Sequence, residues 1–109
     1  MPLSPVIRVE STLRGAARVV AVAGELDISS VARIRQALDD AIAERPEELV
    51  LDLSGLEFCD SSGIHLVVET NERAAQDGIH FSIVRPTGPA WRVFEVCRIE
   101  GDLDFVDSA

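Results

Sequence analysis

Short β-branched runs alternate with segments of helical periodicity along most of the chain, and this alternation constrains the fold more than any other feature. The run ARVVAVAG at 17–24 is apolar and ends at a glycine, which is typical of a buried strand. After the polar segment GELDISS, where Ser29 or Ser30 is the expected N-cap, apolar residues three or four positions apart form one helix face: Val31, Ile34, Leu38 and Ile42. Strands that alternate with helices in this way form a partly parallel sheet covered by helices.

The remaining predicted elements continue the same order. They are an edge strand VIRVES from Val6, a strand ELVLDL at 48–53 followed by SGLEF as a short connection, a helix from Ser62 to about Gln76, a strand at 79–84, a helix from Pro89 to about Arg98 and a short strand at 103–106. The buried side of the helix from Ser62 is expected to hold Ile64, Val67, Val68, Asn71, Ala74 and Ala75.

These elements predict a single α/β domain. Its sheet is expected to be mixed and mostly parallel, with four to five strands packed against three to four helices. A length of 109 residues fits one domain. The expected boundaries are a flexible N-terminus at 1–5, the folded domain at 6–106 and a C-terminal tail at 107–109.

The net charge of the chain restricts the classes of partner that it can bind. The formal net charge is −9, from 19 acidic residues and 10 basic residues that are all arginine. An acidic chain repels phosphate backbones, so nucleic acid is not an expected partner. The charge either steers the domain toward a basic protein surface or only keeps the surface solvated, and both interpretations stay open.

The cysteines and the apolar segments point to a cytoplasmic protein without a metal. Cys59 and Cys97 are far apart in the sequence, no CxxC occurs, and the two histidines complete no zinc pattern. Free, partly buried thiols in a reducing compartment are expected. No segment has the length or hydropathy of a membrane span, and VVAVAGE lacks the apolar length of a signal peptide. No cofactor is expected.

The quartet Asp60-Ser61-Ser62-Gly63 stands between two apolar segments, at a turn from a strand into a helix. In α/β sheets such turns carry the functional groups. Helix capping is the simplest interpretation, because Asp60 or Ser61 can accept from the free N–H groups of the first turn. Phosphorylation of Ser61 is a second interpretation, since a helix N-terminus tolerates an added dianion.

Two catalytic or ligand-binding interpretations of the quartet fit less well. Asp60, Ser61 and His65 supply the residue types of a hydrolase triad, but GxSxG is absent and His65 would lie one turn into the same helix as the serine. A phosphate-binding loop is excluded because no GxxxxGK[ST] occurs and the chain has no lysine. No catalytic residue is therefore assigned.

Two segments resemble a known family. Asp60-Ser61-Ser62-Gly63-Ile64, preceded by Leu56 and Phe58, is similar to the phosphorylation loop of bacterial STAS-domain anti-sigma factor antagonists. Gly24-Glu25-Leu26-Asp27 is similar to the GEL-D segment that follows the second strand of that family. The order and spacing of the elements also match, so that the resemblance covers roughly residues 6–106.

The resemblance implies a phosphorylation-switched regulator of transcription in a stress-response circuit, with no enzymatic activity. The implied partner is both an anti-sigma factor and a serine kinase of the GHKL type. The unmodified antagonist binds this kinase and so releases the sigma factor. Phosphorylation breaks the complex, and a PP2C-type phosphatase restores it. The chain itself is expected to be a monomer or a weak dimer that contacts no membrane.

Carried over residue by residue, the resemblance assigns phosphorylation to Ser61. It assigns partner binding to the GEL-D segment and to the loop, at Asp27, Glu25, Asp60, Ser62, Gly63 and His65. His65 departs from the family, where a small or aliphatic residue is expected, and is interpreted as a solvated side chain that could approach a phosphate on Ser61. Cys97-Arg98-Ile99 departs from the family pattern as well, which leaves partner choice open.

A second function stays open beside the antagonist. STAS domains resembling subunits of lipid-transport ABC complexes act as scaffolds, and such a domain would bind an ATPase without a phosphorylation cycle. The segments Asp60-Ser61-Ser62-Gly63 and Gly24-Glu25-Leu26-Asp27 favour the antagonist.

Overall fold

The structure is a computed structural model that describes residues 7–97 and 103–108. The expected flexible segment at 1–5 and the family departure at Arg98-Ile99 lie outside these residues. In chain order the elements are β1 (Ile7–Arg14), β2 (Ala17–Leu26), α1 (Val31–Ala43), β3 (Glu48–Cys59), α2 (Ser61–Gln76), β4 (His80–Val84), α3 (Gly88–Cys97) and β5 (Phe105–Val106). None of the helices among these described residues is long and apolar enough to cross a membrane.

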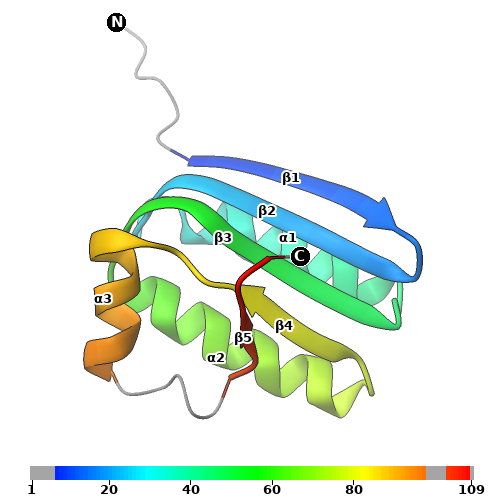
Figure 1. Ribbon diagram of the computed structural model, residues 1–109. Helices are drawn as coiled ribbons and strands as arrows, with labels where there is room; N and C mark the ends of the chain where they lie inside the picture. Colours follow the sequence, from blue (N-terminus) through cyan, green and yellow to red (C-terminus); the bar gives the residue numbers. More distant parts are fainter. Residues whose placement is uncertain (1–6, 98–102, 109) are drawn as a thin grey trace, which may run out of the picture.

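The sheet has five strands in the order β1-β2-β3-β4-β5 (Figure 1). β1 lies at the edge and pairs with β2 in antiparallel direction, whereas every other neighbouring pair is parallel. The predicted α/β fold with a mixed, mostly parallel sheet is therefore confirmed, as is the edge position of the first strand. The described residues form three helices.

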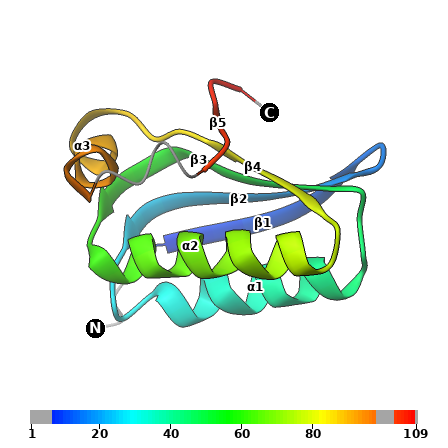
Figure 2. The same ribbon diagram turned by 90° about the horizontal axis from the view of Figure 1, so that it is seen from below.

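The helices α1 and α2 lie side by side under one face of the sheet (Figure 2). The core between these two layers is built from Leu, Ile and Val side chains, with Ile34, Leu38, Leu51, Leu53 and Val67 among those that are almost fully buried. α3 lies at the end of the sheet where β2 and β3 finish (Figures 1 and 2). This end of the sheet therefore gathers the turns that lead into α1 and α2.

The segment SGLEF is not a connection, as the sequence predicted, but part of β3, which continues to Cys59. It pairs with β2 through two register shifts, one between Ala21 and Ala23 and one between Gly24 and Glu25. The Asp52 carboxylate accepts from the backbone N–H of Ser54 at 3.0 Å, a local side-chain contact of the kind that is common in turns. Ser54-Gly55 thus has the chemistry of a turn but lies in a bulged strand.

The buried side of α2 is also rotated from the predicted one. Ile64, Val67 and Ala74 are buried as expected, but Ala75 is exposed, and Leu66 and Thr70 are buried instead. The Thr70 hydroxyl donates to the carbonyl oxygen of Leu66 at 2.7 Å, so its burial leaves no unsatisfied polar group. A hydrogen bond within the helix made a polar residue acceptable in the core, and the apolar pattern gave no sign of it.

Aromatic side chains attach β5 to the rest of the domain. The Phe105 ring lies edge-on to the rings of Trp91 and Phe94, with centroid distances of 4.9 and 5.7 Å. The guanidinium of Arg85 lies 5.3 Å from the centroid of the Trp91 ring. α3 and β5 are thus held together at the edge of the sheet opposite to β1.

Candidate functional site

The carboxyl ends of β2 and β3 finish side by side. Leu26 pairs with Cys59 in the parallel register, and Glu25 pairs with Phe58. The backbone N–H of Asp60 donates to the carbonyl oxygen of Leu26 at 3.1 Å, which extends the pairing one residue beyond the strands. The turns into α1 and α2 are therefore joined directly, and Asp27 and Asp60 each directly follow the last residue of one of the two paired strands.

Asp60 caps α2. Its backbone is extended, with φ −110° and ψ −171°, and its Oδ1 accepts from the backbone N–H of Ser62 at 2.9 Å. The hydroxyl of Ser62 also donates to this carboxylate oxygen. Asp60 thus provides the capping interaction that the quartet suggested, and it engages both polar groups of Ser62.

Ser61 is the first residue of α2, and its side chain is exposed. Across the described residues no side chain or backbone group forms a hydrogen bond with its hydroxyl, in contrast to that of Ser62. The two adjacent serines therefore differ: one is held by the cap, and the other presents a free hydroxyl at the positive end of a helix dipole.

The turn into α1 is organised by Asp27 rather than by a serine cap. Ser30 occupies the predicted N-cap position, but its side chain makes no capping bond to α1 and instead donates to the carbonyl oxygen of Glu25 at 2.9 Å. The Asp27 carboxylate accepts from the backbone N–H of Ser29 at 2.9 Å, from its hydroxyl at 2.6 Å and from the backbone N–H of Ser30 at 3.2 Å. This network fixes the segment that follows Glu25.

Hydrogen bonds from Ser29 and Ser30 hold the pKa of Asp27 below its ordinary value of 3.8, against an opposing effect of desolvation. The charged carboxylate therefore stabilises the folded state above that value, and the stabilisation is lost as the pH falls through the folded pKa.

Asp27→Asn is expected to unfold at a slightly lower temperature than the native chain at about pH 7, with a gap that closes below about pH 3.8. The amide oxygen keeps the acceptor, so only the contribution of the charge is lost. Thermal unfolding of both proteins from about pH 7 to about pH 3 measures the gap. A gap that is constant over this range would show that the charge of Asp27 does not stabilise the fold.

Gly63 lies beneath the loop and not on its surface. A Cβ on this residue would lie 2.5 Å from the Sγ of Cys59 and 2.7 Å from the Cδ2 of Leu26, and both of these residues are buried. The first turn of α2 therefore contacts the strand ends so closely that only glycine fits. The sequence placed Gly63 among the residues that bind a partner, whereas its buried position gives it a packing role.

The thiol of Cys59 is buried under the loop. Burial, together with the nearby charge of Asp60, raises the pKa of its thiol to about 12. Its Sγ donates to the carbonyl oxygen of Asp60 at 3.3 Å. The thiol therefore stays protonated and acts as a packing group under the loop.

Two exposed apolar side chains flank the loop, and the sequence analysis missed them as site residues. Ile28, in the turn after Asp27, is 78% exposed, and Phe58, one residue before the end of β3, is 47% exposed. The acidic residues at the same strand ends are Glu25, Asp27, Glu57 and Asp60. Large apolar residues at the polar end of a sheet were the sequence signal that could have identified this surface.

His65 is exposed on α2, four residues after Ser61. Residues at this spacing are neighbours on a helix. Within residues 7–97 and 103–108, no three His, Cys, Asp or Glu side chains lie together so that they could hold a metal ion. The structure thus brings together Glu25, Asp27, Asp60, Ser61 and Ser62, with His65 one helical turn further along and Gly63 beneath them.

Residues 9–107 match the family described as "Mlab, STAS domain". Over 66 residues, the chain is 33% identical to the anti-sigma-F factor antagonist RsfB of Mycobacterium tuberculosis. The matched stretch covers 61% of this chain and 53% of RsfB, so the chain spans about half the length of this curated relative.

Solved structures share the fold. An anti-sigma factor antagonist from Mycobacterium paratuberculosis superposes with a TM-score of 0.86 at 26% identity, over 96% of this chain and 90% of that one. SpoIIAA in its unphosphorylated form gives a TM-score of 0.75 at 21% identity, over 91% of this chain and 88% of its own. The Bacillus SpoIIAA in its phosphorylated form gives a TM-score of 0.67 at 22% identity, over 92% of this chain and 90% of its own. The likeness to SpoIIAA is one of fold alone.

Proposed function

The chain belongs to the STAS domain family, and on this premise we propose that it is an anti-sigma factor antagonist that binds an anti-sigma factor. The proposed partner is at the same time a serine kinase of the GHKL type. The unmodified chain binds this kinase and frees a sigma factor. Phosphorylation of Ser61 ends the binding, and a PP2C-type phosphatase restores it.

The exposed hydroxyl of Ser61 is the observation that carries the proposal. A kinase needs an accessible hydroxyl with no strong hydrogen bond to break, and Ser61 meets both conditions while Ser62 is engaged by Asp60. A phosphate on Ser61 would lie at the N-terminus of α2, where the helix dipole favours negative charge. The modified loop can therefore keep its fold.

The surroundings of Ser61 suit a basic partner. Four carboxylates lie at the same two strand ends, on Glu25, Asp27, Glu57 and Asp60. In the unmodified chain they attract a cationic surface. A phosphate adds about −1.5 to −2 charges to this cluster. Inside a desolvated interface this charge would exceed what the partner's cations can balance, which supports release on phosphorylation.

Ile28 and Phe58 are proposed to supply the apolar contacts of this interface. Phe58→Ala is expected to weaken binding of the anti-sigma factor about thirtyfold and Ile28→Ala about tenfold, because buried anchors of this kind dominate interface energies. Leu13→Ala is the matched control, since Leu13 is 66% exposed but lies in β1, far from the two strand ends. Calorimetric titration measures the affinity of each variant for the anti-sigma factor. If all three variants lost the same affinity, Ile28 and Phe58 would not be part of the interface.

Phosphorylation of the chain by its anti-sigma kinase tests the proposal directly. After incubation with the kinase and ATP, peptide mass spectrometry is expected to find one phosphate, on Ser61. The Ser61→Ala variant should stay unmodified, and Ser62→Ala should still accept phosphate. A phosphate confined to Ser62, or one that persists in Ser61→Ala, would refute the assignment.

A scaffold subunit of a transport complex stays the second candidate, because the matching family carries the name Mlab rather than that of an antagonist. The two functions differ in what the chain needs. A scaffold stays bound to its ATPase in the presence of ATP, whereas a switched antagonist is released because the Ser61 hydroxyl becomes phosphorylated. Identical partner binding by the native chain, with and without ATP, would favour the scaffold.

A further inference from the structure

The outer edge of β1 is open. β1 stands at one end of the strand order, and among the described residues only β2 pairs with it. In an antiparallel pair, alternate residues direct their backbone N–H and C=O groups away from the partner strand. Half of the backbone groups of β1 therefore point to the open side. Such an edge is a template for another strand unless something blocks it.

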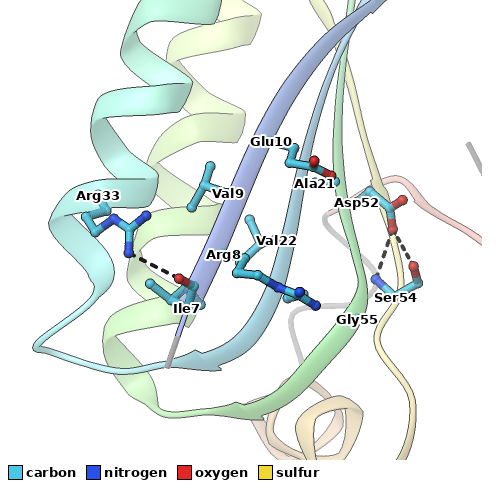
Figure 3. A pocket seen from close by; sticks show the side chains of 11 residues that line it. Ile7, Arg8, Val9, Glu10, Ala21, Val22, Arg33, Asp52, Ser54 and Gly55 are labelled. Carbon is cyan, nitrogen blue, oxygen red and sulfur yellow. Dashed lines mark hydrogen bonds between the residues drawn. The ribbon is translucent and has the colours of Figure 1, made fainter. Parts of the chain in front are cut away.

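The two halves of β1 differ in how accessible this edge is. The residues from Ile7 to Glu10 border a hollow of about 530 Å³, and Ile7 at its start is buried (Figure 3). Arg33 of α1 donates from Nη1 to the carbonyl oxygen of Ile7 at 3.1 Å, so that this end of the strand already has a partner (Figure 3). In the second half, every residue from Glu10 to Arg14 is exposed. Pairing with another strand is thus confined to 10–14.

The charges of this exposed half are complementary to themselves. Val9 packs against the core on the helix side, so the even-numbered residues Glu10, Thr12 and Arg14 share the opposite face of the sheet. When two copies of 10–14 pair in antiparallel direction around Thr12, each Glu10 lies opposite the Arg14 of the other copy. The two Thr12 residues then face each other, and both cross-strand pairings are favourable.

We propose that residues 10–14 form a self-association edge, and that its occupant is a second copy of this chain. The two-fold axis passes through the sheet at Thr12, so that the two sheets continue into one and the helices of both copies lie on the same side. The contact is five residues long on each strand, which places the dimer in the weak class of interfaces.

Self-association through this edge leaves the candidate site around Ser61 accessible in each of the two copies. Arg14 pairs with Ala17 at the start of β2, whereas Ile7 pairs with Gly24 near its end. The proposed contact therefore lies toward the end of the sheet opposite to Leu26 and Asp60. A dimer of this kind presents two loops with Ser61 to solvent and so carries two docking sites at a fixed separation.

Two charge reversals separate this pairing from a general effect of charge. Glu10→Arg raises the net charge of −9 by two units, and Arg14→Glu lowers it by two. If only net repulsion between acidic copies mattered, the first variant would associate more strongly and the second more weakly. The proposed pairing sets like charges opposite each other in both variants, so both are expected to associate less.

Sedimentation equilibrium from about 20 μM to about 1 mM measures the effect, with an expected dissociation constant of about 0.1 mM for the native chain. Each single variant should weaken the dimer about tenfold, and Glu10→Arg with Arg14→Glu should restore it to within about twofold. Amide hydrogen exchange gives a second measurement, because protection at 10–14 should rise with protein concentration while that of β2 stays constant.

Three outcomes would overturn the proposal. They are a native chain that stays monomeric at about 1 mM, a Glu10→Arg variant that associates more strongly, and a double variant that does not regain the dimer. Circular dichroism of each variant shows that its fold is retained, which is expected because both substituted side chains are exposed.

Discussion

Ser61→Asp is expected to fold as the native chain does and to bind the anti-sigma factor about a hundredfold more weakly than Ser61→Ala. The added carboxylate would lie at the N-terminus of α2, next to Asp60. Within the free domain the helix dipole offsets the added charge by about 0.3–1 kcal/mol. In the desolvated interface the same charge would lie among the other carboxylates with no water to screen it. A loss of about 3 kcal/mol in the free energy of binding corresponds to the hundredfold loss of affinity.

Calorimetric titration of the proposed partner, the purified anti-sigma kinase, against the variants measures this effect. Ser61→Asn is the matched control, because asparagine has the size of aspartate without its charge and should bind almost as well as Ser61→Ala. The alanine variant should also stay bound in the presence of ATP. Equal affinities for the Ala and Asp variants, with both proteins folded, would reject charge repulsion and leave the scaffold as the better proposal.

Gly63→Ala is expected to lower the free energy of unfolding by about 2 kcal/mol. Alanine ordinarily stabilises a helix by up to about 1 kcal/mol relative to glycine. Here, however, its Cβ would lie 2.5 Å from the buried Sγ of Cys59 and 2.9 Å from the Cγ of Leu26. Both neighbours are only 1% exposed and lie in the close-packed core, so we expect the first turn of α2 to shift and the clash to outweigh the helix propensity.

Denaturant unfolding of Gly63→Ala, of Cys59→Ala and of the double variant measures the clash as a coupling energy. Removal of Sγ eliminates the shortest contact, so the double variant should be more stable than the sum of the two single effects predicts. Phosphorylation of Ser61 should slow in Gly63→Ala, because the loop moves with the helix. A Gly63→Ala variant as stable as the native chain would show that α2 can shift without cost.

The fold was predictable because its elements depend on local patterns that tertiary structure did not override. The apolar run at 17–24 and the face from Val31 to Ile42 became β2 and α1, with small differences at their ends. SGLEF was mispredicted because Ser54-Gly55 has turn chemistry, while pairing with β2 keeps it extended. The close approach of Gly55 to Ala23, where an added Cβ would lie 2.9 Å away, is set by the neighbouring strand and cannot be seen in a linear pattern.

The candidate site was predictable in position but not in the division of roles. Asp60 next to Ser61 and Ser62 suggested a cap or a phosphate acceptor, and the structure separates the two serines through a single carboxylate. Which serine the carboxylate holds depends on the backbone angles of Asp60. The packing role of Gly63 depends on Leu26, a residue from a different strand. Neither relation follows from the spacing of residues in the sequence.

The two register shifts between β2 and β3 have a consequence for how sequences of this type can vary in length. From Ala21 to Leu26, β2 advances five residues, while β3 advances seven from Asp52 to Cys59, and both strands still finish at the same level. Deleting one residue from this part of β3 would draw Asp60 back by about 3.3 Å and turn the side chain of Cys59 toward the opposite face. We therefore expect insertions and deletions among natural variants to occur in turns such as the one between α1 and β3, while the eight-residue interval from Asp52 to Asp60 keeps its length.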